Sequence, residues 1–89
     1  ELARARAYAG LRRHANAADA YARALAGDSP EQTCQARLAL GLTTGRYLGR
    51  PADAAGHLER YLADGCTSNP VTRAALYALW RGWQAAEGV

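Results

Sequence analysis

A helical pattern that occurs twice, at a constant interval of 37 residues, most constrains the fold of this chain. The repeated side chains are Ala17, Tyr21, Ala24 and Leu25, which recur as Ala54, Leu58, Tyr61 and Leu62. Their spacing places each set on one stripe of an α-helix. Small side chains in the stripe let a neighbouring helix approach, and the larger ones fill the space beside it. A helical unit repeated at such an interval is typical of a solenoid, so the pattern predicts a binding scaffold.

Helix start and stop signals predict five helices, at residues 2–13, 17–26, 30–47, 51–63 and 70–86. The clearest start is Ser29-Pro30, where an N-cap Ser precedes Pro at the first helical position. Asn16 and Asn69 are the expected N-caps of the second and fifth helices, and Gly27 is expected to end the second. No segment alternates with a period of two, so no strand is expected.

The predicted fold is therefore all-α: an antiparallel helix-pair solenoid of about five helices in a right-handed stack. Residues 1–89 form a single domain, divided into a first helix pair (1–29), a second pair (30–69) and the first helix of a third, incomplete repeat (70–89). Gly41 is expected at a close helix contact. The positions expected to be buried are Ala17, Tyr21, Ala24, Leu40, Ala54, Leu58, Leu62, Leu76 and Leu79.

The repeated helix resembles the tetratricopeptide repeat family, in degenerate repeats of bacterial type. The second helix of the family's unit carries Ala, an aromatic residue, a second Ala and often Leu, with Pro a few residues later. The matching residues in the first copy are Ala17, Tyr21, Ala24, Leu25 and Pro30. In the second copy they are Ala54, Leu58, Tyr61, Leu62 and Pro70, with Tyr61 where Ala is usual. The first-helix pattern is partly present as Leu40-Gly41, although Thr44 replaces the aromatic residue.

This resemblance covers nearly the whole chain and implies a protein–protein interaction scaffold whose first helices line a concave groove. When the groove positions of the family are transferred to this sequence, the resemblance implies that the partner-binding residues are Arg6, Leu42, Arg46, Tyr77, Arg81 and Gln84. Each inner helix then contributes one Arg, which favours an acidic peptide or a C-terminal carboxylate as the partner. The alternative is that these arginines are ordinary solvated side chains and that Tyr77 belongs to the core.

The two cysteines occupy corresponding places on one predicted hairpin. Cys34 lies near the start of the third helix and Cys66 just past the end of the fourth, each 16 residues from the turn near Arg50. Equal counts place them nearly level across an antiparallel hairpin, so they could form a disulfide. The alternative is two reduced thiols. A bridge favours a periplasmic or otherwise exported protein, and reduced thiols favour the cytoplasm.

Composition and motifs narrow the classes of function. All eleven basic residues are Arg, and with eight acids the net charge is +3, too small to indicate nucleic-acid binding. No stretch is long and apolar enough to span a membrane, so no direct membrane insertion is expected. Cys34, His14, His57 and Cys66 are scattered, which disfavours a metal site or a nucleophile pair. Neither a cofactor nor enzymatic activity is predicted.

A structural role is the second hypothesis for the function. The chain opens on Glu1 rather than Met, so we interpret it as a piece of a longer protein. It would then be a segment of a longer helical array, or a self-associating module. The last predicted helix carries Trp80 and Trp83 on a face that the incomplete repeat leaves without a partner helix, and a homodimer could bury them.

Overall fold

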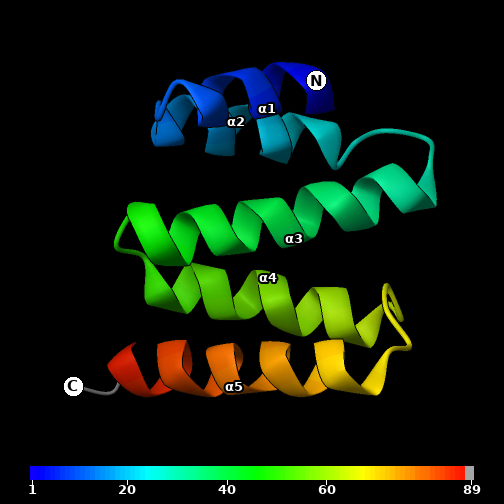
Figure 1. Cartoon of the computed structure of the whole chain (residues 1–89), viewed down its shortest axis with the longest axis vertical. Helices are drawn as coiled ribbons and strands as arrows, with labels where there is room; N and C mark the ends of the chain where they lie inside the picture. Colours follow the sequence, from blue (N-terminus) through cyan, green and yellow to red (C-terminus); the bar gives the residue numbers. More distant parts are fainter. Residues whose placement is uncertain (88–89) are drawn as a thin grey trace.

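The computed structural model describes residues 1–87, which form an all-helical chain (Figure 1). Its five helices are α1 (Leu2–Gly10), α2 (His14–Ala24), α3 (Pro30–Tyr47), α4 (Pro51–Ala63) and α5 (Pro70–Glu87). Each helix packs against the next one in the sequence, from α1 on α2 to α4 on α5. Successive helices run in opposite directions, so the α1–α2 and α3–α4 turns lie at the same end of the molecule (Figure 1). The all-α prediction is confirmed for the residues described.

The helix starts that carry strong local signals are the predicted ones. The Ser29 side chain accepts a hydrogen bond from the backbone N–H of Gln32 at 3.3 Å, and Pro30 occupies the first turn of α3. Asn69 Oδ1 accepts from the N–H groups of Val71 and Thr72 at 2.9 and 3.0 Å, which caps α5. These side chains satisfy N–H groups that have no partner within the helix.

The limits predicted for the first two helices are wrong. α1 ends at Gly10, not residue 13, because Arg12 adopts a left-handed backbone with φ of 59°. α2 begins at His14 rather than at Ala17, so Asn16 lies inside the helix and does not cap it. The connection closes through backbone bonds, including Arg13 N–H to Tyr8 C=O at 2.9 Å. A turn built from the main chain leaves no side-chain signal in the sequence.

The end of α2 also differs from the prediction. The helix stops at Ala24 and tightens into a final turn in which the N–H of Gly27 bonds to the carbonyl of Ala24 at 3.2 Å. Gly27 therefore does not serve as a left-handed C-cap. The glycines with positive φ follow α3 and α4 instead: Gly49 at 64° and Gly65 at 69°.

Two apolar clusters hold the helices together. The buried residues of the first are Ala5, Ala17, Ala18, Ala20, Tyr21 and Leu40, from α1 to α3. Those of the second are Leu58, Tyr61, Leu62 and Leu76, from α4 and α5. Of the positions expected in the core, Ala24 and Leu79 are only half-buried, and the other seven are buried. The repeated stripe therefore builds both clusters.

Gly41 lets α3 and α4 approach closely, as predicted. A β-carbon at this position would lie 3.1 Å from the Cβ of His57 and 3.6 Å from the carbonyl oxygen of Ala54. The first contact is tighter than ordinary van der Waals separation, so an alanine would require His57 to shift by a few tenths of an ångström. The absence of a side chain at Gly41 therefore permits the close approach of α3 and α4.

Candidate functional site

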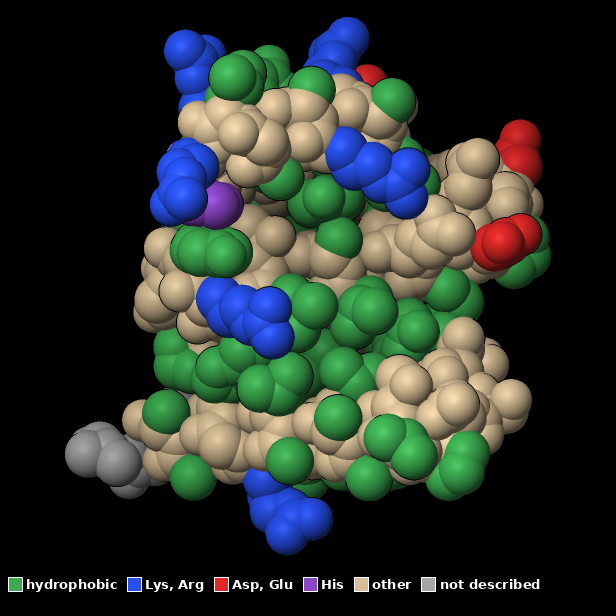
Figure 2. All heavy atoms as spheres, viewed as in Figure 1, with side chains coloured by type: hydrophobic (Ala, Val, Ile, Leu, Met, Phe, Trp, Pro, Cys, Tyr) green, Lys and Arg blue, Asp and Glu red, His purple; other side chains and the backbone are tan. Residues whose placement is uncertain are grey.

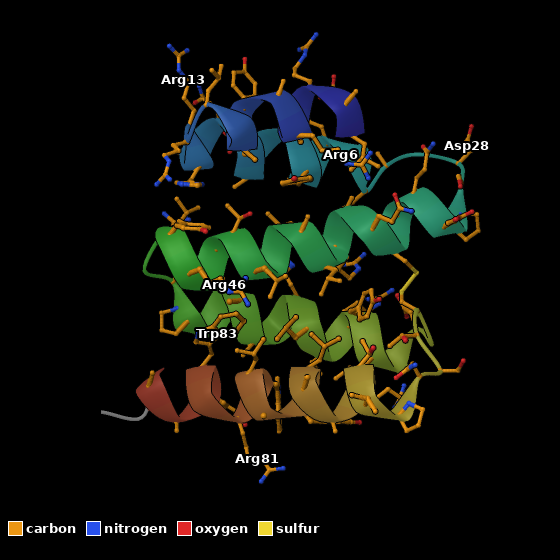
Figure 3. The ribbon with its side chains drawn as sticks, in the orientation of Figure 1. Arg6, Arg13, Asp28, Arg46, Arg81 and Trp83 are labelled. Carbon is orange, nitrogen blue, oxygen red and sulfur yellow. A yellow bond between two sulfur atoms is a disulfide. The ribbon has the colours of Figure 1, made fainter. Side chains whose placement is uncertain are left out.

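Arg6 and Arg46 come from two different helices and lie on the same face of the stack, the one turned to the viewer in Figures 2 and 3. Arg6, on α1, donates a hydrogen bond from Nη2 to Oε1 of Gln35 on α3, at 3.2 Å. This bond holds the Arg6 side chain across the boundary between the two helices. Arg46 is exposed on the last turn of α3.

Leu38 and Leu42 connect these two arginines along α3. Leu38, Leu42 and Arg46 follow one another at intervals of four residues, so they form one stripe of the helix. Both leucines are half-buried and keep part of their surface accessible. We call the set of Arg6, Gln35, Leu38, Leu42 and Arg46 the arginine face. In Figure 2, apolar side chains (green) surround the basic side chain (blue) that lies in the middle of the view.

The α5 residues assigned to the groove do not lie on the arginine face. Arg81 extends away from the stack on the side of α5 remote from α4 (Figure 3). Tyr77 lines a different hollow, of about 460 Å³, between α4 and α5. Gln84, seven residues beyond Tyr77, falls on the same side of α5. Of the six residues carried over from the resemblance, Arg6, Leu42 and Arg46 therefore belong to the arginine face, and the three from α5 lie outside it.

The α5 residue that faces α3 is Trp83, which the groove assignment missed. Its indole packs directly on Gly45, one residue before Arg46 (Figure 3). The missed signal was the register of buried leucines. Leu40 in α3 and Leu76 in α5 are both 6% exposed and lie 36 residues apart, whereas the groove assignment pairs Leu42 with Tyr77 and Arg46 with Arg81, which lie 35 residues apart. Successive residues of an α-helix point about 100° apart, so an error of one residue in the register between α3 and α5 assigns the wrong face of α5 to the groove.

The charges of the arginine face are not balanced by acids. Within residues 1–87, the ion pairs join Glu1 to Arg4 and Arg23, and Arg60 to Asp64. The hydrogen bond from Arg23, at 2.8 Å, lowers the pKa of the Glu1 carboxyl. Neither Arg6 nor Arg46 takes part in these pairs, so both guanidinium groups keep donors for a ligand.

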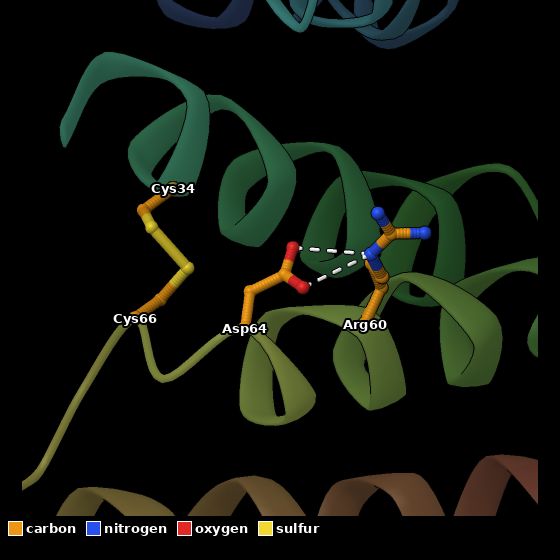
Figure 4. Close-up of polar contacts among 4 residues, drawn as sticks. All are labelled: Cys34, Arg60, Asp64 and Cys66. Carbon is orange, nitrogen blue, oxygen red and sulfur yellow. Dashed lines mark hydrogen bonds and ion pairs between the residues drawn. A yellow bond between two sulfur atoms is a disulfide. The ribbon is translucent and has the colours of Figure 1, made fainter. Parts of the chain in front are cut away.

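Cys34 and Cys66 are joined by a disulfide, with Cα atoms 5.6 Å apart (Figure 4). The bridge ties the loop after α4 to the second turn of α3. The Arg60–Asp64 pair lies next to it on α4, with Nε donating to both carboxylate oxygens at 3.1 Å. The two half-buried cysteines therefore fix the hairpin end opposite Arg46, outside the arginine face.

Among residues 1–87, no three His, Cys, Asp or Glu residues are grouped so that they could hold a metal ion. Burial of His57, and next the positive charge of Arg37, lower the pKa of the His57 side chain from 6.5, while Asp53 opposes the shift. In the part of the chain that is described, no helix has the length and apolar character needed to cross a bilayer.

Comparison of the chain with protein-family models, with curated protein sequences and with solved structures finds no match.

Proposed function

We propose that this chain is a tetratricopeptide-like interaction scaffold, with its helix pairs in a right-handed stack, and that it binds an acidic protein segment on the arginine face. The observation that carries the proposal is the pairing of Arg6 and Arg46. They come from different helices, they lie outside the ion pairs of the described chain, and they flank two half-buried leucines. No enzymatic role is proposed.

The chemistry of the face suits a peptide that combines carboxylates with apolar side chains. A guanidinium group can donate two parallel hydrogen bonds to one carboxylate, which gives direction as well as affinity. Leu38 and Leu42 offer apolar contact between the charges. Because both arginines are near solvent, the electrostatic part of the affinity weakens as salt rises.

A pair of designed peptides tests this proposal. The first alternates Glu and Leu, and the second alternates Lys and Leu; both carry a fluorophore for anisotropy titration. We expect the chain to bind the Glu peptide more tightly, and Arg6→Ala and Arg46→Ala each to weaken that binding about fivefold. Arg81→Ala is the matched control, because Arg81 points away from the stack. Equal affinity for both peptides, or no loss in Arg46→Ala, would contradict the proposal.

Self-association through α5, alone or within a longer helical array, is a second candidate function. The hollow between α4 and α5 is lined by Glu59, Leu62, Arg73, Tyr77 and Trp80, and the Tyr77 side chain is 42% exposed. Two-fold pairing of this surface would cover Tyr77 and bring oppositely charged residues of two copies together. Trp83 does not belong to this surface, since it packs on Gly45.

Sedimentation equilibrium of the chain and of Tyr77→Glu tests the second candidate. A dimer that becomes monomeric in the variant supports it. If the chain is a monomer at every concentration, self-association through α5 is excluded. That result would not affect the proposal of peptide binding at the arginine face.

A further inference from the structure

A second hollow of the described structure lies on the other side of α3 from the arginine face. It measures about 710 Å³ and runs between α2 and α4, with α3 as its floor. The floor residues Leu40, Thr44 and Leu48 recur every four residues along α3. Thr44 and Arg46 are two residues apart, which separates them by about 200° around the helix. A ligand in this hollow would therefore not compete directly with one on the arginine face.

The walls of the hollow are shaped to admit a helix. The α2 wall consists of Ala15, Ala18, Asp19, Ala22 and Leu25, at helical spacings of one, three and four residues. It extends for about 15 Å along α2, or about three helical turns. The opposite wall carries Ala52 and Gly56, and a β-carbon at Gly56 would meet nothing within 4 Å. Small wall side chains and a leucine floor leave room for large apolar side chains of a docked helix.

The charged groups at the rim favour a basic ligand. Asp19 projects from α2 and Asp53 from α4, so a carboxylate stands on each wall. Neither is a member of the ion pairs found in residues 1–87. Arg50 contributes a positive group at one end of the hollow. His57 also belongs to the lining, and its lowered pKa favours the neutral form of its side chain. In a chain of net charge +3, this hollow is thus a locally acidic region.

We infer that this hollow is a second docking groove, which binds a cationic amphipathic helix of a partner protein. The apolar side of that helix lies on the half-buried Leu25 and Leu48 and on the exposed Ala15 and Ala22. Its Lys or Arg side chains pair with Asp19 and Asp53. The groove goes beyond the proposed function, because it selects the opposite charge on a separate surface. A scaffold with two such surfaces joins an acidic partner to a basic one.

Two designed helical peptides of about three turns test the groove. Both carry Leu at helical spacings of three and four residues, with Lys at the other positions in one and Glu in the other. Because the Glu peptide would also bind the arginine face under the proposed function, the two peptides are compared in the double variant Arg6→Ala, Arg46→Ala. We expect this variant to bind the Lys peptide more tightly than the Glu peptide, although the remaining net positive charge of the variant opposes non-specific attraction of the Lys peptide. Asp19→Asn with Asp53→Asn should weaken binding of the Lys peptide about fivefold to tenfold.

Two further variants separate the groove from the arginine face and from a general loss of folding. Ala22→Trp places a bulky ring at an exposed wall position and should abolish binding of the Lys peptide while circular dichroism stays helical. Arg46→Ala should leave that binding unchanged. The inference is overturned if the Arg6→Ala, Arg46→Ala variant binds the Lys peptide no better than the Glu peptide. It is also overturned if the Asn variants bind the Lys peptide as tightly as the original chain, or if Ala22→Trp still binds it. Two copies of the chain that pair through the groove would sediment as a dimer, and Ala22→Trp would convert that dimer to a monomer. This outcome would also overturn the inference.

Discussion

The indole of Trp83 occupies the space in which a β-carbon at Gly45 would lie. This contact joins α5 to α3, two helices that are not neighbours in the sequence. It places Trp83 beside Arg46 and directs Arg81 to the outside of the stack (Figure 3). The rotation of α5, and with it the position of Arg81 outside the arginine face, therefore depends on the absence of a side chain at residue 45.

Gly45→Ala should destabilise the chain through this contact. Compared with Gly82→Ala, where a β-carbon meets nothing within 4 Å, we expect a free energy of unfolding lower by about 1–3 kcal/mol, the usual cost of overpacking. Both substitutions gain the same helix propensity, so the difference isolates the collision with Trp83. Urea unfolding followed by tryptophan fluorescence measures both variants, and equal midpoints would show that the indole moves away without cost.

The Cys34–Cys66 disulfide should contribute measurably to stability. It closes a segment in which the two cysteines are 32 residues apart in sequence, and loop-closure entropy predicts a loss of about 3–4 kcal/mol when the bridge is absent. We expect this loss in the double variant Cys34→Ser, Cys66→Ser. The same loss should occur in the original chain after reduction. Thiol titration of the unfolded, non-reduced chain should detect no free thiol, and two thiols per chain would contradict the bridge.

Tyr21→Ala should be among the most damaging single substitutions. The ring is 7% exposed in the cluster shared by α1, α2 and α3, and truncation of a large buried side chain costs about 3–5 kcal/mol. Tyr21→Phe retains the ring and should cost much less. Thermal and urea unfolding of the two variants measure the difference, and a loss below about 0.5 kcal/mol in Tyr21→Ala would place the ring at the surface.

His57 should make the chain less stable at mildly acidic pH. Burial and Arg37 lower its pKa in the folded chain below 6.5, so the unfolded chain binds the proton first as the pH falls. Stability should therefore decrease from about pH 7 through pH 6.5 and level off below the folded pKa. His57→Gln should flatten this dependence in urea unfolding between about pH 7.5 and pH 5.5, above the range in which carboxylates titrate. An unchanged slope would show that His57 is not responsible.

Local chemistry explains which parts of the fold were predictable from the sequence. Ser29 and Asn69 cap the helices they precede, and Gly41 lies at the predicted close contact, because each signal acts over a few residues. The α1–α2 turn was mispredicted because backbone hydrogen bonds and the positive φ of Arg12 close it, and none of the three connecting residues, Leu11 to Arg13, is a usual turn residue.

The sequence by itself determined the all-α class, the starts of the last three helices and the buried stripe that recurs as Ala17 and Ala54. Such features follow from helical periodicity and capping, which are properties of neighbouring residues. Only the tertiary structure decided that Trp83 rather than Arg81 turns toward α3, and that a hollow remains between α2 and α4. Both depend on the rotation and separation of whole helices, and a shift of one residue in register turns a side chain by about 100°.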